Sequence, residues 1–145
     1  PTKEEEKLII RSNVRKEGLS KVSPILTPED ILRSRALVRE VYLDEKIEQY
    51  IVDIVFATRK PAQYGLSDLE NLIDFGCSPR ASINLALASK AYAFLQGRAF
   101  VTPEDVRAIA KDVMQHRIGL TYEAEAESIN ASDVITSILN KVEVP

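Results

Sequence analysis

The amino-acid sequence predicts an all-α fold, a helical bundle of about five or six helices. Several stretches carry apolar residues at the i, i+3, i+4 spacing that places them on one face of a helix. Most of these stretches follow a Ser, Thr, Asp or Asn, which are the residues that best cap a helix N-terminus. Residues 72–75 and 117–127 have a more extended pattern, so the sequence also allows one minor two-stranded β pairing.

The composition limits the size and class of the protein. With 145 residues, of which 45% are hydrophobic, the chain is long enough for one domain with a substantial core. The net charge of -3 argues against a nucleic-acid partner, and no run approaches the ~18 apolar residues of a membrane span. A single cysteine cannot form an internal disulfide and favours a cytoplasmic location. The first residues resemble no targeting signal and include no Met, so we expect a piece of a longer protein.

The first part of the chain is expected to contain three helices. Thr2 caps the first, which runs to about Asn13 and carries Glu5 where a capping box requires an acid. A polar connector over residues 18–24 leads to the second helix, from Pro28 to about Val41. The third helix follows Asp44 and runs to about residue 58, with an apolar stripe of Ile47, Tyr50, Ile51, Ile54 and Val55.

The second part alternates between helices and short extended pieces. Residues 61–75 are expected to form a short helical turn and then an extended piece. A central helix over residues 79–96 and a fifth helix over residues 103–116 follow. Residues 117–127 alternate weakly, which predicts an extended edge segment that can pair with residues 72–75. A last helix follows a cap at Asn130 or Ser132, with apolar positions at Val134, Ile135, Ile138 and Leu139.

The central helix is the most apolar element of the sequence. One stripe at helical spacing consists of Ile83, Leu87, Ala91 and Phe94. A neighbouring stripe consists of Leu85, Ala88, Tyr92 and Leu95. Because the two stripes cover most of the circumference, the helix is expected to be buried and its N-terminal end to be a rigid support.

Three residues open this helix. The Ser78 hydroxyl is expected to accept a bond from a first-turn N–H, and Pro79 suits a position whose N–H would be unpaired. Arg80 falls in the first turn, where the helix dipole disfavours a cation by roughly 0.3–1 kcal/mol. An anion bound in front of the free N–H groups, such as a phosphate, would make the position favourable. The alternative is an ordinary solvated arginine.

The segment Gly76-Cys77-Ser78-Pro79-Arg80-Ala81-Ser82 resembles the sensor-2 motif of MoxR-type AAA+ ATPases. The resemblance continues with Gly97-Arg98, with Val101-Thr102-Pro103-Glu104-Asp105-Val106 and with His116-Arg117. It covers nearly the whole chain and is most specific in the second half; Cys77 stands where alanine is more familiar. In that family the segment is a helical lid that follows the nucleotide-binding core. Residues 1–145 are therefore expected to be one lid-domain fragment, with 1–24 leading from the missing core and 25–145 forming the bundle.

The resemblance implies that Arg80 is the sensor-2 arginine, which reaches across the crevice between lid and core to the γ-phosphate. Arg80 is then the implied catalytic residue, and Ser78 and Pro79 join it as implied nucleotide contacts. The sequence has no phosphate loop and no strand-end acid pair that could hold magnesium. ATP and Mg²⁺ would therefore be bound by the missing core, and the fragment alone would not hydrolyse ATP.

The implied function is a nucleotide-sensing lid that couples ATP hydrolysis to chaperone-like remodelling in the cytoplasm. The implied partners are the chain's own AAA+ core, neighbouring ring subunits and proteins that carry von Willebrand A domains. The alternative from another class is a non-catalytic helical adaptor that docks a protein partner, with Arg80 as a surface anchor. The sequence upstream of Pro1 would discriminate between the two hypotheses.

Four other residues are weaker candidates. Arg98 is expected to pair with acids at the start of the fifth helix, and His116 with Arg117 to complement the end of that helix. Cys77 and His116 could form a thiolate pair, but a small buried cysteine is the expectation that we prefer. One His and one Cys are too few for a structural zinc site.

Overall fold

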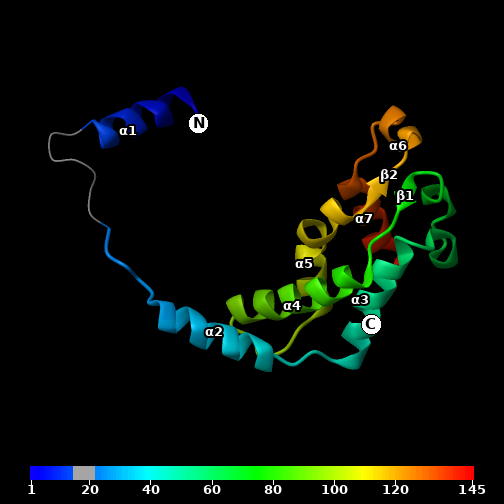
Figure 1. The fold of residues 1–145 in the computed structure, drawn as a ribbon, viewed down its shortest axis with the longest axis horizontal. Helices are drawn as coiled ribbons and strands as arrows, with labels where there is room; N and C mark the ends of the chain where they lie inside the picture. Colours follow the sequence, from blue (N-terminus) through cyan, green and yellow to red (C-terminus); the bar gives the residue numbers. More distant parts are fainter. Residues whose placement is uncertain (15–21) are drawn as a thin grey trace. The chain divides into compact units, whose positions relative to one another are not determined.

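The computed structural model describes residues 1–14 and 22–145 and confirms the all-α class (Figure 1). The chain divides into two compact units, residues 1–32 and 33–145. The described helices are α1 (Lys3–Asn13), α2 (Pro28–Glu40), α3 (Glu45–Ala57), α4 (Pro79–Leu95), α5 (Pro103–Met114), α6 (Tyr122–Ala126) and α7 (Ala131–Lys141). Two strands, β1 (Ile73–Phe75) and β2 (Gly119–Leu120), accompany 3-10 helices at Pro61–Tyr64, Ser67–Leu69 and Gln115–Arg117.

Helices α1 and α2 begin as the sequence predicts. The Glu5 N–H donates to the Thr2 hydroxyl at 3.4 Å, and the Thr2 N–H donates to the Glu5 carboxylate at 2.6 Å. At the start of α2, Thr27 and Asp30 exchange the same kind of bonds, at 3.0 and 3.2 Å. Neither helix has a buried residue. Most of the connector predicted over residues 18–24 lies outside the described residues.

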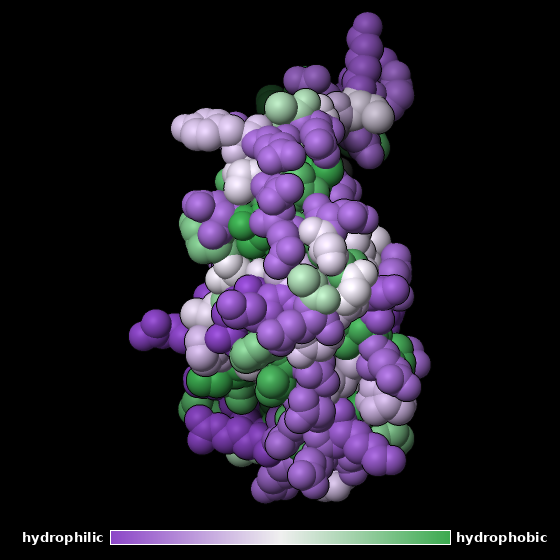
Figure 2. Space-filling view, turned by 90° about the vertical axis from the view of Figure 1, so that its right-hand side faces the viewer, coloured by the Kyte–Doolittle hydropathy of each residue, from purple (hydrophilic) through white to green (hydrophobic). Residues whose placement is uncertain are grey.

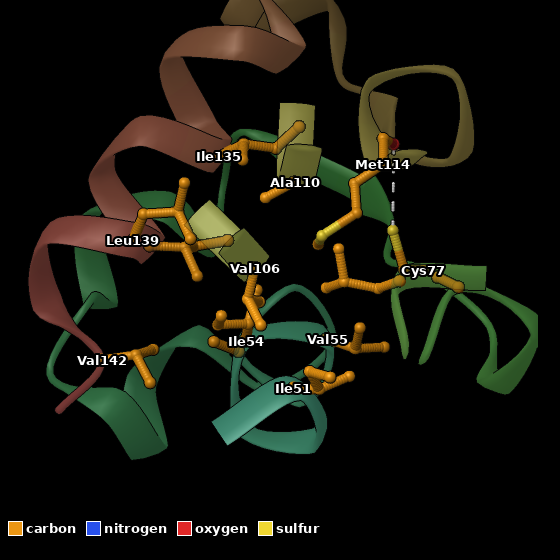
Figure 3. Close-up of a cluster of buried hydrophobic side chains, with 14 of the residues drawn as sticks. Ile51, Ile54, Val55, Cys77, Val106, Ala110, Met114, Ile135, Leu139 and Val142 are labelled. Atoms are coloured by element: carbon orange, nitrogen blue, oxygen red, sulfur yellow. Dashed lines mark hydrogen bonds between the residues drawn. The ribbon is translucent and has the colours of Figure 1, made fainter. Parts of the chain in front are cut away.

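The core of the unit formed by residues 33–145 lies between α3, α4, α5 and α7. The predicted α3 stripe is buried, with relative exposures between 0 and 6%. Figure 3 shows side chains from α3, α5 and α7 pointing toward one another around Ile54, Val106 and Leu139. Each fully buried side chain of this size contributes about 1.5–3 kcal/mol to folding, so this cluster supplies much of the stability.

Helix α4 corrects the expectation of a helix buried around most of its circumference. Its buried residues are Ala81, Leu85, Ser89 and Ala93, which lie on one face. Ile83 and Leu87, from the first predicted stripe, are 59% and 54% exposed. The reason is that α3 and α5, its main neighbours, cover only one side of the helix. Apolar residues all around a helix indicate what it could bury, and tertiary structure decides which face is covered.

The predicted β pairing between residues 72–75 and the segment after α5 is confirmed. Strands β1 and β2 pair antiparallel, with Ile73 opposite Leu120 and Phe75 opposite Gly119. The Thr121 hydroxyl adds a bond to the Asn71 carbonyl at 2.7 Å. In the chain, β1 follows the 3-10 helix Ser67–Leu69 and β2 directly precedes α6, so the ribbon lies next to α6 (Figure 1).

The extended segment predicted over residues 117–127 is wrong beyond residue 121, where α6 begins. The Thr121 hydroxyl accepts a bond from the Ala124 N–H at 3.4 Å and so caps this helix. Ala124 is fully buried, whereas the acids Glu123 and Glu125 are exposed. A helix of five residues is too short for its period to be distinguished from strand alternation in the sequence.

Helix α7 is capped by Asn130, one of the two predicted caps. The Asn130 side chain accepts a bond from the Asp133 N–H at 3.1 Å, and the Asp133 carboxylate accepts one from the Asn130 N–H. The four predicted apolar residues of α7 are buried.

Among the described residues, no helix is both long enough and apolar enough to cross a membrane. On the face that Figure 2 shows, hydrophilic groups predominate, with small hydrophobic groups between them.

Candidate functional site

The site that the sequence predicts lies at the N-terminus of α4. Ser78 is the N-cap residue in extended conformation and Pro79 is the first helical residue, as predicted. The expected cap bond is wrong, because the Ser78 hydroxyl accepts no bond from the first turn. Instead the Ala81 N–H donates to the Ser78 carbonyl at 2.8 Å. The exposed Ser78 hydroxyl therefore does not satisfy the first-turn N–H groups.

Arg80 is exposed in the first turn of α4. Within residues 1–14 and 22–145, its side chain has no hydrogen bond and no ion pair. The first turn of α4 also contains no acidic residue that could neutralise it. An uncompensated cation beside free helix N–H groups is a favourable arrangement for binding an anion.

The turn that precedes α4 is fixed to the end of α3. The Cys77 N–H donates to the Thr58 hydroxyl at 2.8 Å, and that hydroxyl donates to the Val55 carbonyl at 2.7 Å. Thr58 is 1% exposed and Cys77 is fully buried. Gly76 passes so close that a Cβ atom there would lie 2.4 Å from the Thr58 carbonyl oxygen. This turn therefore cannot move without breaking buried hydrogen bonds and close packing.

Two further arginines lie near this turn. The Arg59 guanidinium is 4.5 Å from the centre of the Phe56 ring, and Arg117 Nε donates to the Val113 carbonyl at 2.9 Å. Burial raises the pKa of the Cys77 thiol overall, and both positive charges are close enough to oppose that rise. They add to the positive potential on the side of the unit where α4 begins, which favours an anionic ligand.

Cys77 is a small buried residue, as we expected from the sequence. Burial raises the pKa of its thiol, and the opposing effects of the Thr58 bond, Arg117 and Arg59 are smaller. Its Sγ lies 3.9 Å from the Met114 carbonyl oxygen (Figure 3). A protonated, enclosed thiol is unsuited to act as a nucleophile, so the thiolate pair with His116 is not formed. His116 itself is exposed in the 3-10 turn after α5.

Arg98 pairs with the start of α5, as predicted. Its guanidinium contacts both carboxylate oxygens of Asp105, one of them at 2.7 Å, and also donates to the Phe100 carbonyl at 3.2 Å. Burial would raise the pKa of Asp105, but the bonds from Arg98 and from the Thr102 N–H outweigh it and hold that pKa below the usual value of 3.8. Arg98 is therefore engaged in holding the connection between α4 and α5.

The N-terminus of α4 presents hydrogen-bond donors that can bind an anion. In residues 1–14 and 22–145, no group of three His, Cys, Asp or Glu side chains is arranged to hold a metal ion. A planar guanidinium such as that of Arg80 can donate to two phosphate oxygens, and Ser78 and the first-turn N–H groups belong to the same end of α4. These donors suit an anionic ligand such as a phosphate group.

Sequence reasoning missed Thr58 and Arg59, which it treated only as the end of a helix. Thr58 brings together α3 and the turn before α4, and Arg59 lies along the same turn. The available signal was that Thr58 is a polar residue at the end of the buried stripe of α3. Such a residue must bond its hydroxyl within the protein, but the sequence alone does not say to which partner.

Comparison with known families matches residues 67–138 to the AAA lid domain. The whole chain is 38% identical to Chaperone MoxR1 of Mycobacterium tuberculosis and 32% identical to protein YeaC of Bacillus subtilis, spanning 38% and 42% of their lengths. Over 89 residues, 57% of this chain, it is 42% identical to Protein MoxR of Paracoccus denitrificans, of which it covers 26%.

A solved structure has the same fold. The crystal structure of a candidate ATPase from Cytophaga hutchinsonii superposes with a TM-score of 0.91 at 41% identity, over 99% of this chain and 44% of that one. The chain thus spans less than half the length of these relatives. The ordered motifs of the sequence, the lid match and the shared fold agree. The chain belongs to the MoxR-type AAA+ ATPase family, and residues 67–138 are its AAA lid domain.

Proposed function

We propose that this chain is the nucleotide-sensing lid of a longer MoxR-like AAA+ ATPase, in which Arg80 contacts the γ-phosphate of bound ATP. The observation that carries this proposal is the state of Arg80, which is exposed, uncompensated and presented by a fixed turn. The length of the relatives, of which this chain spans about two fifths, supports a separate core that binds ATP and Mg²⁺.

The proposed mechanism follows from the chemistry of a guanidinium. Arg80 donates two parallel bonds to phosphate oxygens and offsets the negative charge that spreads over them during phosphoryl transfer. Ser78 and the N-terminus of α4 contact the same group, and Pro79 fixes the backbone there. When the γ-phosphate leaves, the lid loses one anchor, so the orientation of the lid reports which nucleotide is bound.

The partners of the whole protein belong to the same proposal. We expect the lid to work with its own AAA+ core and with neighbouring subunits of a ring in the cytoplasm, in a chaperone-like remodelling activity. The name Chaperone MoxR1 of the Mycobacterium tuberculosis relative supports this activity class. Proteins with von Willebrand A domains are the partner class that we would test first.

The decisive experiment is Arg80→Ala in the full-length protein, with steady-state ATP turnover as the measurement. We expect kcat to fall by about 10- to 1000-fold, the size of losing one transition-state charge contact. Lys111→Ala is the matched control, because Lys111 is an exposed cation on α5. Both variants should unfold at the wild-type denaturant midpoint, since both side chains are exposed.

Wild-type turnover of Arg80→Ala would remove the sensor role and favour the helical adaptor. Arg80→Lys gives a further test, because lysine keeps the charge and loses the two-pronged geometry. We expect it to recover only part of the lost turnover. For the 145-residue chain alone, calorimetry should show no ATP binding tighter than about millimolar, since a single charged contact supplies little affinity. Micromolar binding would contradict the proposal that a separate core domain binds ATP.

A further inference from the structure

We propose that Thr58 is a positioning residue for Arg80, and this inference rests on the sensor role proposed above. Its hydroxyl links the end of α3 to the turn before α4 and so fixes the direction in which Arg80 leaves the helix. Thr58 lies at the C-terminal end of α3, 22 residues before Arg80 in the sequence, and is 1% exposed. It contacts no nucleotide in this scheme and acts only through Arg80.

The hydroxyl of Thr58 both donates and accepts a hydrogen bond within this link. A hydroxyl has one donor, which Thr58 gives to the Val55 carbonyl at 2.7 Å. It also accepts, and it accepts the Cys77 N–H at 2.8 Å. Both contacts are buried, so neither water nor another side chain can replace a lost partner without rearrangement. Removing the hydroxyl would leave the Cys77 N–H buried without an acceptor.

Close packing also restricts the position of the turn that contains Cys77. A Cβ atom on Gly76 would lie 2.4 Å from the Thr58 carbonyl oxygen and 2.8 Å from Arg59 Cγ. The backbone of the turn thus lies directly on the end of α3, and the Thr58 hydroxyl fixes the next residue. Arg80 lies three residues after Cys77. A shift of the turn backbone would therefore also displace the guanidinium at the end of the Arg80 side chain. A displacement of about 1 Å can reduce catalysis by about 100-fold.

The experiment compares Thr58→Val with Thr58→Ser. Valine keeps the branched shape and removes the hydroxyl, whereas serine keeps the hydroxyl and removes a methyl group. In the full-length protein we expect Thr58→Val to lower kcat for ATP about 10-fold or more, with KM changed by less than about 3-fold. Thr58→Ser should stay within about 3-fold of wild type, because its hydroxyl can still bond Cys77 and Val55.

A double-mutant cycle with Arg80→Ala separates positioning from general damage. If Thr58 acts through Arg80, Thr58→Val should cause no further loss of kcat in the Arg80→Ala background. An equal loss in both backgrounds would overturn the inference. Thr136→Val is the control, because the Thr136 hydroxyl also bonds a carbonyl, that of Ser132 at 2.7 Å, but lies on α7. We expect it to leave kcat unchanged.

Amide hydrogen exchange on the 145-residue chain gives a readout that does not depend on activity. Thr58→Val should speed exchange of the Cys77 amide about 10-fold or more, and Thr58→Ser should not. Unchanged protection in Thr58→Val would overturn the inference while leaving the proposed role of Arg80 intact. Faster exchange together with wild-type turnover of Arg80→Ala would instead contradict the proposed function, and the positioning role with it.

Discussion

Two arginines of this chain occupy opposite ends of α4 and differ in what compensates their charge. Arg98 lies beyond its C-terminus and holds both carboxylate oxygens of Asp105. Arg80 lies in the first turn, where no acidic residue is available within that turn. A side chain that is to bind a ligand phosphate must not be neutralised beforehand, because an existing ion pair would compete with it. The two positions are therefore suited to a structural and a binding role, respectively.

At the same scale, the pKa of Asp105 predicts a dependence of stability on pH. A carboxyl whose pKa is lower in the folded chain stabilises the fold at pH values above its pKa in the unfolded chain. It loses this contribution as pH falls through the folded value. We expect Asp105→Asn to unfold at lower urea concentration at pH 7 and the gap from wild type to narrow below about pH 4.

The measurement is the urea midpoint of both proteins between pH 7 and pH 3. Asp112→Asn is a suitable control, because Asp112 is exposed on the same helix. If the difference in urea midpoint between Asp105→Asn and wild type stayed constant over this range, the ionisation of Asp105 would not contribute to the pH dependence of stability.

At the scale of elements, α4 combines a buried face with an exposed apolar face. Leu85 is fully buried against the core, and Leu87, two residues later, is 54% exposed. The same residue type in the same helix thus has two environments, which only the packing of α3 and α5 distinguishes. The sequence contains both leucines in apolar stripes and gives no basis for ranking them.

This difference makes a matched pair of substitutions informative. We expect Leu85→Ala to lower the free energy of unfolding by about 2–5 kcal/mol, since it removes buried methyl groups and leaves a cavity. Leu87→Ala should change it by less than about 0.5 kcal/mol, because its side chain is largely solvated. Chemical denaturation of the 145-residue chain measures both. Equal losses would indicate that the exposed face of α4 is covered in solution.

At the scale of the whole molecule, stability is concentrated in residues 33–145. This unit contains the buried cluster of α3, α4, α5 and α7, whereas α1 and α2 have no buried residue. Helix α2 spans the division between the two units, so its Thr27 cap should be kept in any shortened chain. A shortened chain is therefore expected to fold through the same core.

We predict that deletion of residues 1–25 leaves the denaturant midpoint of the main transition unchanged within error. The physical reason is that the deletion removes no buried apolar side chain from the described residues. Circular dichroism during urea unfolding measures this midpoint, and the helical signal of α1 should be the part that is lost. A large decrease of the midpoint would show that the first residues support the core.

The sequence by itself determined the helices with long periodic stripes and good caps, among them α3 with Asp44 and α7 with Asn130. It also indicated the β1–β2 pairing, the Arg98 partner and the MoxR-type motifs around Arg80. The caps, the stripes and the Arg98 partner depend on residues close in the chain, and the family motifs depend on an order that one sequence can display. The β1–β2 pairing joins segments far apart in the chain, but each segment has an extended pattern of its own. Local signals of this kind survive because capping and periodicity are properties of a single segment.

Tertiary structure decided what depends on neighbours distant in the chain. It left Ile83 exposed on α4, made a helix of residues 122–126, and left the Ser78 hydroxyl without a first-turn bond. It also brought Thr58 to Cys77 across 19 positions of sequence. Burial and long-range hydrogen bonds are set by which elements pack together, and the pattern within a helix does not say which of its faces a neighbour will cover or which distant group will bond a buried hydroxyl.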